Sequence, residues 1–183
     1  MVAAPLPTSE PRVLLRPITP ARLEACLALT LPEHQRGWVA PNVFSLAQAC
    51  TDPCLHPRGV YDLGEWIDAP DREPTMKGFV MYEVKDGAGF IMRVMIDQAF
   101  HRRGYGRGTI AEVIRSLRLI PEVRVIAVSH RSDNQPAAGL YASLGFSPWT
   151  PSGSPGKKDE TYLFLDPQSA SVMAKERDDA AQR

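Results

Sequence analysis

Several features that would assign this chain to a specialised class of protein are missing from its 183 residues. The three cysteines are odd in number and sparsely placed, so no framework of paired disulfides is implied. No stretch approaches the roughly 18 consecutive apolar residues of a membrane-spanning helix. Lys plus Arg and Asp plus Glu each total 21, and the net charge of zero argues against general nucleic-acid binding. We therefore expect a globular protein that binds neither nucleic acid nor a membrane.

The N-terminal residues also lack the marks of a secretory signal. They have no basic region followed by a long apolar run, so we expect a cytoplasmic protein. A length of 183 residues suits one domain with its own core. We expect a flexible lead-in over residues 1–11, a single domain over residues 12–166, and a flexible or helical tail over residues 167–183.

Cys50, Cys54 and His56 have a spacing that resembles part of a zinc site. A fourth ligand is not evident, and Pro53 and Pro57 constrain the chain around them. Free cysteines also commonly serve as small buried apolar residues. We therefore predict no metal site.

The apolar patterns along the chain predict a mixed α/β fold. Strand-like runs, helical spacings and turn residues follow one another in the order βα α βββ α β α ββ, which favours helices over a largely antiparallel sheet. The strands are expected at about residues 13–17, 56–63, 77–85, 90–97, 123–128, 146–150 and 162–165. The helices are expected after Thr19, from Asn42 or Ser45 towards Cys50, from Thr109 to Ile120 and from Asn134 to Gly145, with a loop from Gly64 to Thr75.

The stretch from Phe90 to Gly108 combines an apolar strand, a basic turn and the start of a helix. Such a turn aims several main-chain N–H groups at one point, which suits a phosphate. The turn holds three glycines and three arginines: Gly104, Gly106, Gly108, Arg102, Arg103 and Arg107. It is not a P-loop, and its Gly-x-Gly-x-Gly spacing is not the Gly-x-Gly-x-x-Gly of a dinucleotide site. We therefore expect a cofactor that carries a pyrophosphate.

A later helix places two polar groups on one face. Asn134 and Tyr141 are seven residues apart, which is about two turns or roughly 10 Å. The helix follows the strand that neighbours the glycine turn, so these side chains can line a groove that leads away from the phosphate. The simpler alternative is that Asn134 only caps the helix and Tyr141 only fills the core.

Two runs of the sequence resemble the signatures of the GNAT superfamily of N-acetyltransferases. His101–Gly106 is similar to the motif Gln/Arg-x-x-Gly-x-Gly/Ala, with His101 in the place of Gln or Arg. Asn134–Phe146 is similar to Asn-x-x-Ala-x-x-Leu-Tyr-x-x-x-Gly-Phe. The runs follow in the family's order with a strand between them, and the resemblance covers about residues 12–166. It implies the GNAT-like fold and an enzyme that moves an acetyl group from acetyl-CoA to an amine.

The resemblance also implies roles for particular residues. Asn134 would bind the pantetheine arm, and Tyr141 would protonate the departing thiolate. A main-chain N–H near Val94 or Met95 would contact the acetyl carbonyl. The pyrophosphate would lie on the N–H groups of Arg102, Arg103, Gly104, Tyr105, Gly106 and Arg107, and the pantetheine would run beside Val94, Met95 and Ile96.

The base that deprotonates the amine is left open by the sequence. Many family members place a glutamate on the strand before the glycine turn, but residues 90–93 hold no carboxylate. Glu83 on the adjacent strand, Glu33 in the first interhelical loop, or a chain of water molecules can take this role. Glu83 can equally face solvent, and Glu33 can equally form a loop salt bridge.

The acceptor is expected to be a small-molecule amine. Residues 32–49 are similar to a segment of the bacterial spermine/spermidine N-acetyltransferases, which favours a polyamine, although Trp38 replaces their phenylalanine. The alternatives are an aminoglycoside, an amino acid or a protein amine as acceptor, or a non-catalytic module that binds acyl-CoA. Homodimers are common among such proteins, but the sequence identifies no interface.

Overall fold

The computed structural model describes residues 11–150 and 159–166 of the chain. The elements, in chain order, are β1 (Val13–Pro17), α1 (Pro20–Leu27), η1 (Glu33–Gln35), α2 (Asn42–Thr51), β2 (Leu55–Asp62), α3 (Leu63–Asp68), β3 (Gly78–Lys85), β4 (Ala88–Ile96), η2 (Gln98–Phe100), α4 (Tyr105–Arg118), β5 (Val125–Arg131), α5 (Gln135–Ser143), β6 (Ser147–Pro148) and β7 (Glu160–Leu165). The predicted mixed α/β fold is confirmed.

The strands form one sheet in the order β1-β2-β3-β4-β5-β7-β6. All neighbours pair antiparallel except β4 and β5, which run parallel. The connection between these two parallel strands is α4, as a crossover between parallel strands requires. The sheet is therefore antiparallel on both sides of a single parallel pair at its centre.

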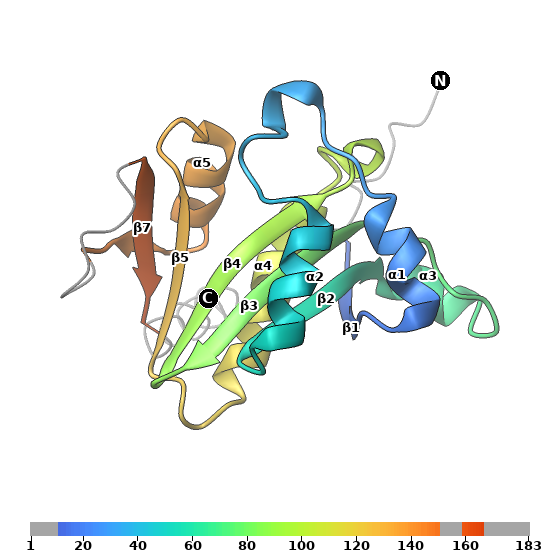
Figure 1. Cartoon of the computed structure of the whole chain (residues 1–183), viewed down its shortest axis with the longest axis horizontal. Helices are drawn as coiled ribbons and strands as arrows, with labels where there is room; N and C mark the ends of the chain where they lie inside the picture. Colours follow the sequence, from blue (N-terminus) through green and yellow to red (C-terminus); the bar gives the residue numbers. More distant parts are fainter. Residues whose placement is uncertain (1–10, 151–158, 167–183) are drawn as a thin grey trace, which may run out of the picture.

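Helices cover both faces of the sheet. Figure 1 shows α2 in front of β3 and β4, and α4 behind the same strands. On the α4 side, Ile110, Val113 and Leu117 are fully buried against apolar side chains of the central strands. On the α2 side, Phe79 and Met81 of β3 pack against Leu46 and other apolar residues. Alternating residues of β3 thus pack into two separate cores, one on each face of the sheet, and this fixes the register of the strand.

Two local predictions from the sequence were wrong. Helix α3 occupies residues 63–68, where the sequence predicted the end of a strand at Leu63 and a loop from Gly64, because the Asp62 carboxylate accepts a hydrogen bond from the Gly64 N–H (2.8 Å) and caps the helix. Helix α4 starts at Tyr105 and not at Thr109, because Gly104 has the positive φ of 84° that lets the chain turn into a helix. The glycines that were expected to precede the helix therefore lie in its first turn.

The acidic segment around α3, residues 61–73, holds five carboxylates and one arginine, and basic residues from other elements form ion pairs with it. The Glu65 carboxylate contacts the buried Lys77 ammonium (2.5 Å), and Glu73 pairs with Arg22 (2.7 Å) and Arg16 (3.5 Å). The hydrogen bond and charge of Arg22 lower the pKa of Glu73. Part of this negative charge therefore serves the fold.

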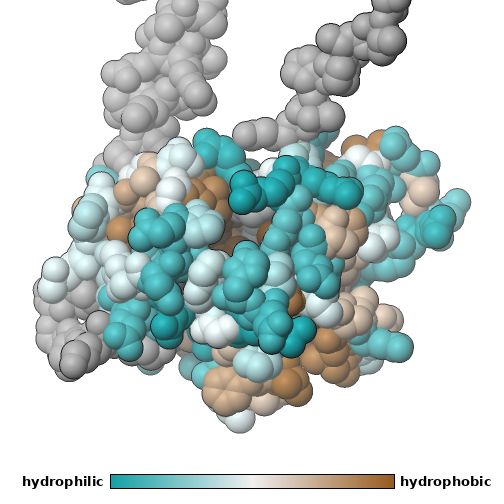
Figure 2. Space-filling model, turned by 90° about the horizontal axis from the view of Figure 1, so that it is seen from above, coloured by the Kyte–Doolittle hydropathy of each residue, from teal (hydrophilic) through white to brown (hydrophobic). Residues whose placement is uncertain are grey.

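The described surface, helices and His, Cys, Asp and Glu side chains give no sign of a membrane span or a metal site. Seen from above (Figure 2), hydrophilic residues cover the middle of the face and hydrophobic residues gather towards one edge. In residues 11–150 and 159–166, no helix is long and apolar enough to cross a bilayer. The same residues contain no group of three His, Cys, Asp or Glu side chains that could hold a metal ion.

The packing of α4 against the sheet gives a prediction for stability. Leu117 is fully buried, whereas Leu119, two residues later, is 70% exposed. We expect Leu117→Ala to lower the free energy of unfolding by about 2–5 kcal/mol, since it removes buried methyl groups and leaves a cavity. Leu119→Ala is the matched control and should change it by less than about 0.5 kcal/mol. Urea denaturation measures both; equal effects would contradict the packing described.

Candidate functional site

A cleft opens where the two parallel strands part. The pairing of β4 with β5 runs from Ala88 to Ile91 and stops there. One extra residue, Met92, forms a bulge against β3, and such bulges bend a strand. Beyond the bulge, the cleft has a volume of about 290 Å³ and is lined by β4, the turn into α4, the end of β5, and α5. The residues between α1 and α2 close its fourth side.

The turn between β4 and α4 is held in a defined shape. The Asp97 carboxylate accepts hydrogen bonds from the Thr30 N–H (2.7 Å) and the Ala99 N–H (2.9 Å). His101, in the place of the expected Gln or Arg, contacts the Ile96 carbonyl through Nε2 at 2.8 Å. Because a carbonyl only accepts, this imidazole nitrogen carries the proton. The turn is thereby fastened to β4 and to the connection after α1.

The first turn of α4 faces the cleft with main-chain groups. Gly104 and Gly106 line the cleft, and a Cβ at Gly106 would meet nothing closer than 3.8 Å. A ligand can therefore approach the backbone closely here. The N–H groups of a helix's first turn have no intrahelical carbonyl partner, and the helix dipole adds partial positive charge. The exposed side chains of Arg102 and Arg103 increase it. This end of the cleft suits an anion.

Two other residues of the turn use their side chains elsewhere. The Tyr105 hydroxyl donates to the Asp62 carboxylate at 2.6 Å, and burial raises its pKa strongly. Arg107 donates to the Ser143 hydroxyl at 2.7 Å and so joins α4 to α5. Arg103 and Arg107 are not among the lining residues. Of the turn, the structure places Arg102, Gly104, Tyr105 and Gly106 at the cleft.

The unpaired half of β4 forms one wall. Of the three β4 residues predicted to lie beside the pantetheine, Val94 and Ile96 line the cleft, whereas Met95 does not and is 7% exposed. Met95 lines a neighbouring apolar pocket of about 540 Å³ between β4 and the connection from α1 to α2. The described pairing of β4 with β5 ends at Ile91, so the main chain beyond it can pair with an extended ligand.

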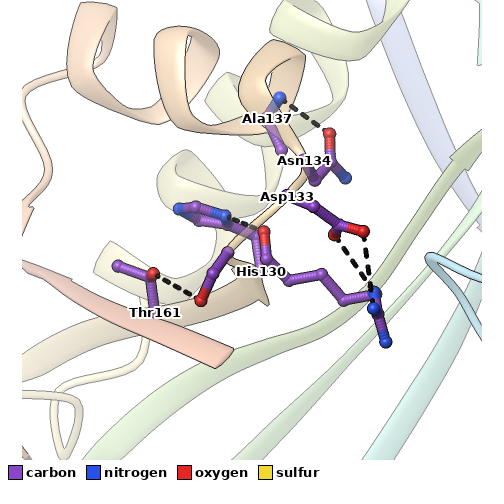
Figure 3. A network of polar contacts seen from close by, with 7 residues as sticks. His130, Asp133, Asn134, Ala137 and Thr161 are labelled. Carbon is purple, nitrogen blue, oxygen red and sulfur yellow. Dashed lines mark hydrogen bonds and ion pairs between the residues drawn. The ribbon is translucent and has the colours of Figure 1, made fainter. Parts of the chain in front are cut away.

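Helix α5 forms the opposite wall, and both predicted residues lie on it. The Asn134 Oδ1 accepts a hydrogen bond from the Ala137 N–H at 3.1 Å, so Asn134 caps the helix (Figure 3). Asn134 also lines the cleft, and the cap uses only its oxygen. The two interpretations of Asn134, cap and cleft residue, are therefore compatible.

Tyr141 is both a core residue and a cleft residue. It is 5% exposed, packs on Phe146 (ring centroids 5.5 Å apart) and lines the cleft. Burial raises the pKa of its hydroxyl strongly, so the phenol stays protonated at neutral pH. It can therefore donate a proton or a hydrogen bond, but it cannot act as a base.

His130 lies beside Tyr141, which the sequence did not predict. The imidazole stacks on the Tyr141 ring, with 6.0 Å between centroids. Its Nδ1 donates to the Arg131 carbonyl at 2.8 Å (Figure 3). An ion pair between Arg131 and Asp133 (3.1 Å) holds the following turn. The signal was present in the sequence, because alternation along β5 puts His130 on the same side as the buried Val128.

Neither predicted base reaches the cleft. Glu33 is exposed at the start of η1, although Leu31 and Gln35 on either side of it line the cleft. Glu83 lies opposite Phe90, in the half of the sheet where β4 and β5 are still paired. Among the described residues that line the cleft there is no aspartate or glutamate. The roles of Glu33 and Glu83 stay predictions.

The comparisons with known proteins agree with this geometry. The family model for the acetyltransferase (GNAT) family matches residues 27–146. That range contains the glycine turn, both cleft walls and Tyr141. A search of curated proteins gives no match.

Solved structures show the same fold at low sequence identity. Spermidine N-acetyltransferase from Vibrio cholerae, in complex with CoA and spermine, is 16% identical with a TM-score of 0.66, over 88% of this chain and 98% of that one. The ribosomal-protein-S18-alanine N-acetyltransferase from Escherichia coli is 18% identical with a TM-score of 0.59, over 84% of this chain and 93% of that one. At these identities the likeness shows the fold alone.

The cap on α5 gives a prediction. We expect Asn134→Ala to lower the free energy of unfolding by about 0.5–2 kcal/mol, because the Ala137 N–H loses its partner. Gln135→Ala, at the exposed next position, is the matched control and should be nearly neutral. Thermal or urea unfolding measures both. A stability of Asn134→Ala equal to that of the control would show that the cap contributes nothing.

Proposed function

Because the chain belongs to the acetyltransferase (GNAT) family, we propose that it moves an acetyl group from acetyl-CoA to a primary amine of a small molecule. The transfer occurs by direct attack of the amine in a ternary complex. The observation that carries the proposal is the single cleft that joins the anion-binding first turn of α4 to the buried phenol of Tyr141.

The residues of the cleft fit acetyl-CoA. The N–H groups and arginines at the start of α4 suit its pyrophosphate. The unpaired edge of β4 at Val94, Met95 and Ile96 suits the amide groups of the pantetheine, which can pair with it like a strand. Asn134 offers a further polar group on the opposite wall. When bound, acetyl-CoA supplies the activated acetyl group as a thioester.

The protein's own groups then promote the transfer. A main-chain N–H of β4 near Val94 or Met95 stabilises the charge that develops on the acetyl oxygen. The Tyr141 hydroxyl, kept protonated by its burial, gives its proton to the departing sulfur. Stacking on His130 and packing on Phe146 hold the phenol in place. A non-catalytic module that only binds acyl-CoA has no need of such an acid.

The identity of the amine is a separate question. The similarity of residues 32–49 to polyamine acetyltransferases favours spermine or spermidine. A polyamine carries only positive charge and needs carboxylates to bind it. Glu33 is exposed and lies in the sequence between Leu31 and Gln35, which line the cleft, so it is the candidate to supply one. The polyamine therefore remains a prediction that an assay with an amine panel tests directly.

Tyr141 gives the first test of the mechanism. We expect Tyr141→Phe to lower kcat by at least about tenfold, since a positioned acid contributes about 10²–10⁴-fold, and to leave the affinity for CoA nearly unchanged. Tyr61→Phe removes an equally buried hydroxyl from the opposite layer and is the matched control. Release of free CoA thiol measures kcat. An unchanged kcat in Tyr141→Phe would remove this residue from the acid role.

Gly104 gives a test of the anion site. An alanine here would hold an unfavourable φ of 84° and place its Cβ 2.8 Å from Pro11 Cδ. The turn must then shift, and we expect Gly104→Ala to weaken CoA binding by about tenfold. Gly37→Ala is the control, since its Cβ would meet nothing within 4 Å. Calorimetric titration with CoA measures both; equal affinities would place the pyrophosphate elsewhere.

A further inference from the structure

Arg93 is a cation in the cleft that the proposed acetyl transfer does not use. It lies on β4 immediately after the Met92 bulge and lines the cleft. Its register partner is Met81, whose side chain belongs to the core on the α2 side. The guanidinium reaches towards Gln48 of α2, where Nη2 lies 3.5 Å from Oε1. Arg93 therefore approaches the cleft from the α2 side of the sheet.

The half-buried guanidinium of Arg93 does not have all of its hydrogen bonds satisfied within the protein. Nη1 donates to the Met92 carbonyl at 3.0 Å, and the contact to Gln48 is long. The buried Nε has no hydrogen-bond partner within the described part of the chain. Burial lowers the pKa of Arg93, and the charge of Glu160 acts in the opposite direction. A half-buried guanidinium with a spare N–H gains strongly from a carboxylate, which it binds through two N–H groups.

A hydroxyl and a carboxylate lie on the same side of the sheet. Val128 faces α4 and α5, so alternation turns the next residue, Ser129, to the α2 side. Ser129 lines the cleft, and its hydroxyl donates to the Glu160 carboxylate of β7 at 2.8 Å. Figure 1 shows α2 over β3 and β4, while on this face none of the described helices covers β5 and β7. Arg93 and Ser129, which both lie on this side of the sheet, line the cleft, so an acceptor bound on this side can contact it.

We propose that Arg93, Ser129 and Glu160 form the acceptor site, and that the acceptor carries a carboxylate as well as its amine, as a free amino acid does. The carboxylate binds Arg93, and the amine lies towards Ser129 and Glu160. This proposal rests on the acetyl transfer proposed above. It differs from the polyamine prediction, because a polyamine would bring only positive charge towards a half-buried arginine.

The proton balance of the transfer is complete with these groups. The C–N bond forms as the C–S bond breaks. The ammonium loses two protons: one leaves through Ser129 and Glu160 to water, and the other restores the proton that Tyr141 gives to the sulfur. The products are the N-acetylated acid, CoA as the thiol, and one proton released to solvent.

The test compares matched acceptors. The twenty amino acids, their carboxamides, and spermidine are assayed with acetyl-CoA by thiol release on the full chain. We expect at least one amino acid to exceed its own amide in kcat/KM by at least about tenfold, because the amide offers the arginine no carboxylate to bind. Arg93→Met should reduce that ratio to near one, mainly through KM, and Arg93→Lys should retain part of it.

A control variant and a check of folding make the result unambiguous. Arg115→Met is the control, since Arg115 is exposed on α4 and pairs with Glu112 of the same helix. Thermal unfolding checks that each variant is folded, and Arg93→Lys gives the comparison if Arg93→Met is not. Preference for spermidine or an amide, or a ratio unchanged by both Arg93 variants, would overturn the acceptor site alone. Acceptance of none of these amines but of another amine in a wider panel would likewise overturn the acceptor site, whereas acceptance of no amine at all by a protein that binds CoA would overturn the proposed transfer itself.

Discussion

The separation of β4 from β5 after Ile91 is the constraint on which the rest of the site depends. Adjacent strands in a sheet normally satisfy each other's main-chain groups along their whole length. Here a bulge at Met92 bends β4 while its pairing with β3 continues to Ile96. One edge of β4 stays paired and the other opens. The fold thereby supplies an unpaired strand edge along a cleft, where an extended ligand can pair with it.

The N-termini of α4 and α5 lie on the two sides of the cleft. This explains why the most recognisable sequence motifs are found at these two helix termini. Gly104 lets α4 begin against the cleft, and Asn134 caps α5 across from it. The hydrogen bond between Arg107 and Ser143 joins the two helices. Each helix is also fixed by the core behind it, through residues such as Leu117 and Tyr141. Ligand groups thus meet rigid main chain, and little order has to be created on binding.

The sequence predicts the parts of the site that depend on local rules and misses those that depend on register. Glycine spacing and helical periodicity located the turn at Gly104 and the pair Asn134 and Tyr141. Glu83 could not be judged this way, because only the strand pairing shows that it lies opposite Phe90, in the closed half of the sheet. Arg93 was overlooked for the same reason. In a strand that alternates regularly, Arg93 would lie on the same face as Ile91. The bulge at Met92 turns the Arg93 side chain to the other face.

The distribution of charge follows from where each charge finds its partner. In the acidic segment around α3, Glu65 and Glu73 are paired by Lys77 and Arg22, so this segment contributes less free negative charge than its composition suggests. The described lining of the cleft contains arginines and histidines but no carboxylate. The pyrophosphate of the proposed donor and the carboxylate of the proposed acceptor would both reduce the positive charge of the arginines. The first ligand to bind removes part of the attraction for the second, unless the two anions lie at opposite ends of the cleft. In the proposal the two anions bind different elements: the pyrophosphate binds the start of α4, and the carboxylate binds Arg93 on β4 directly after the bulge.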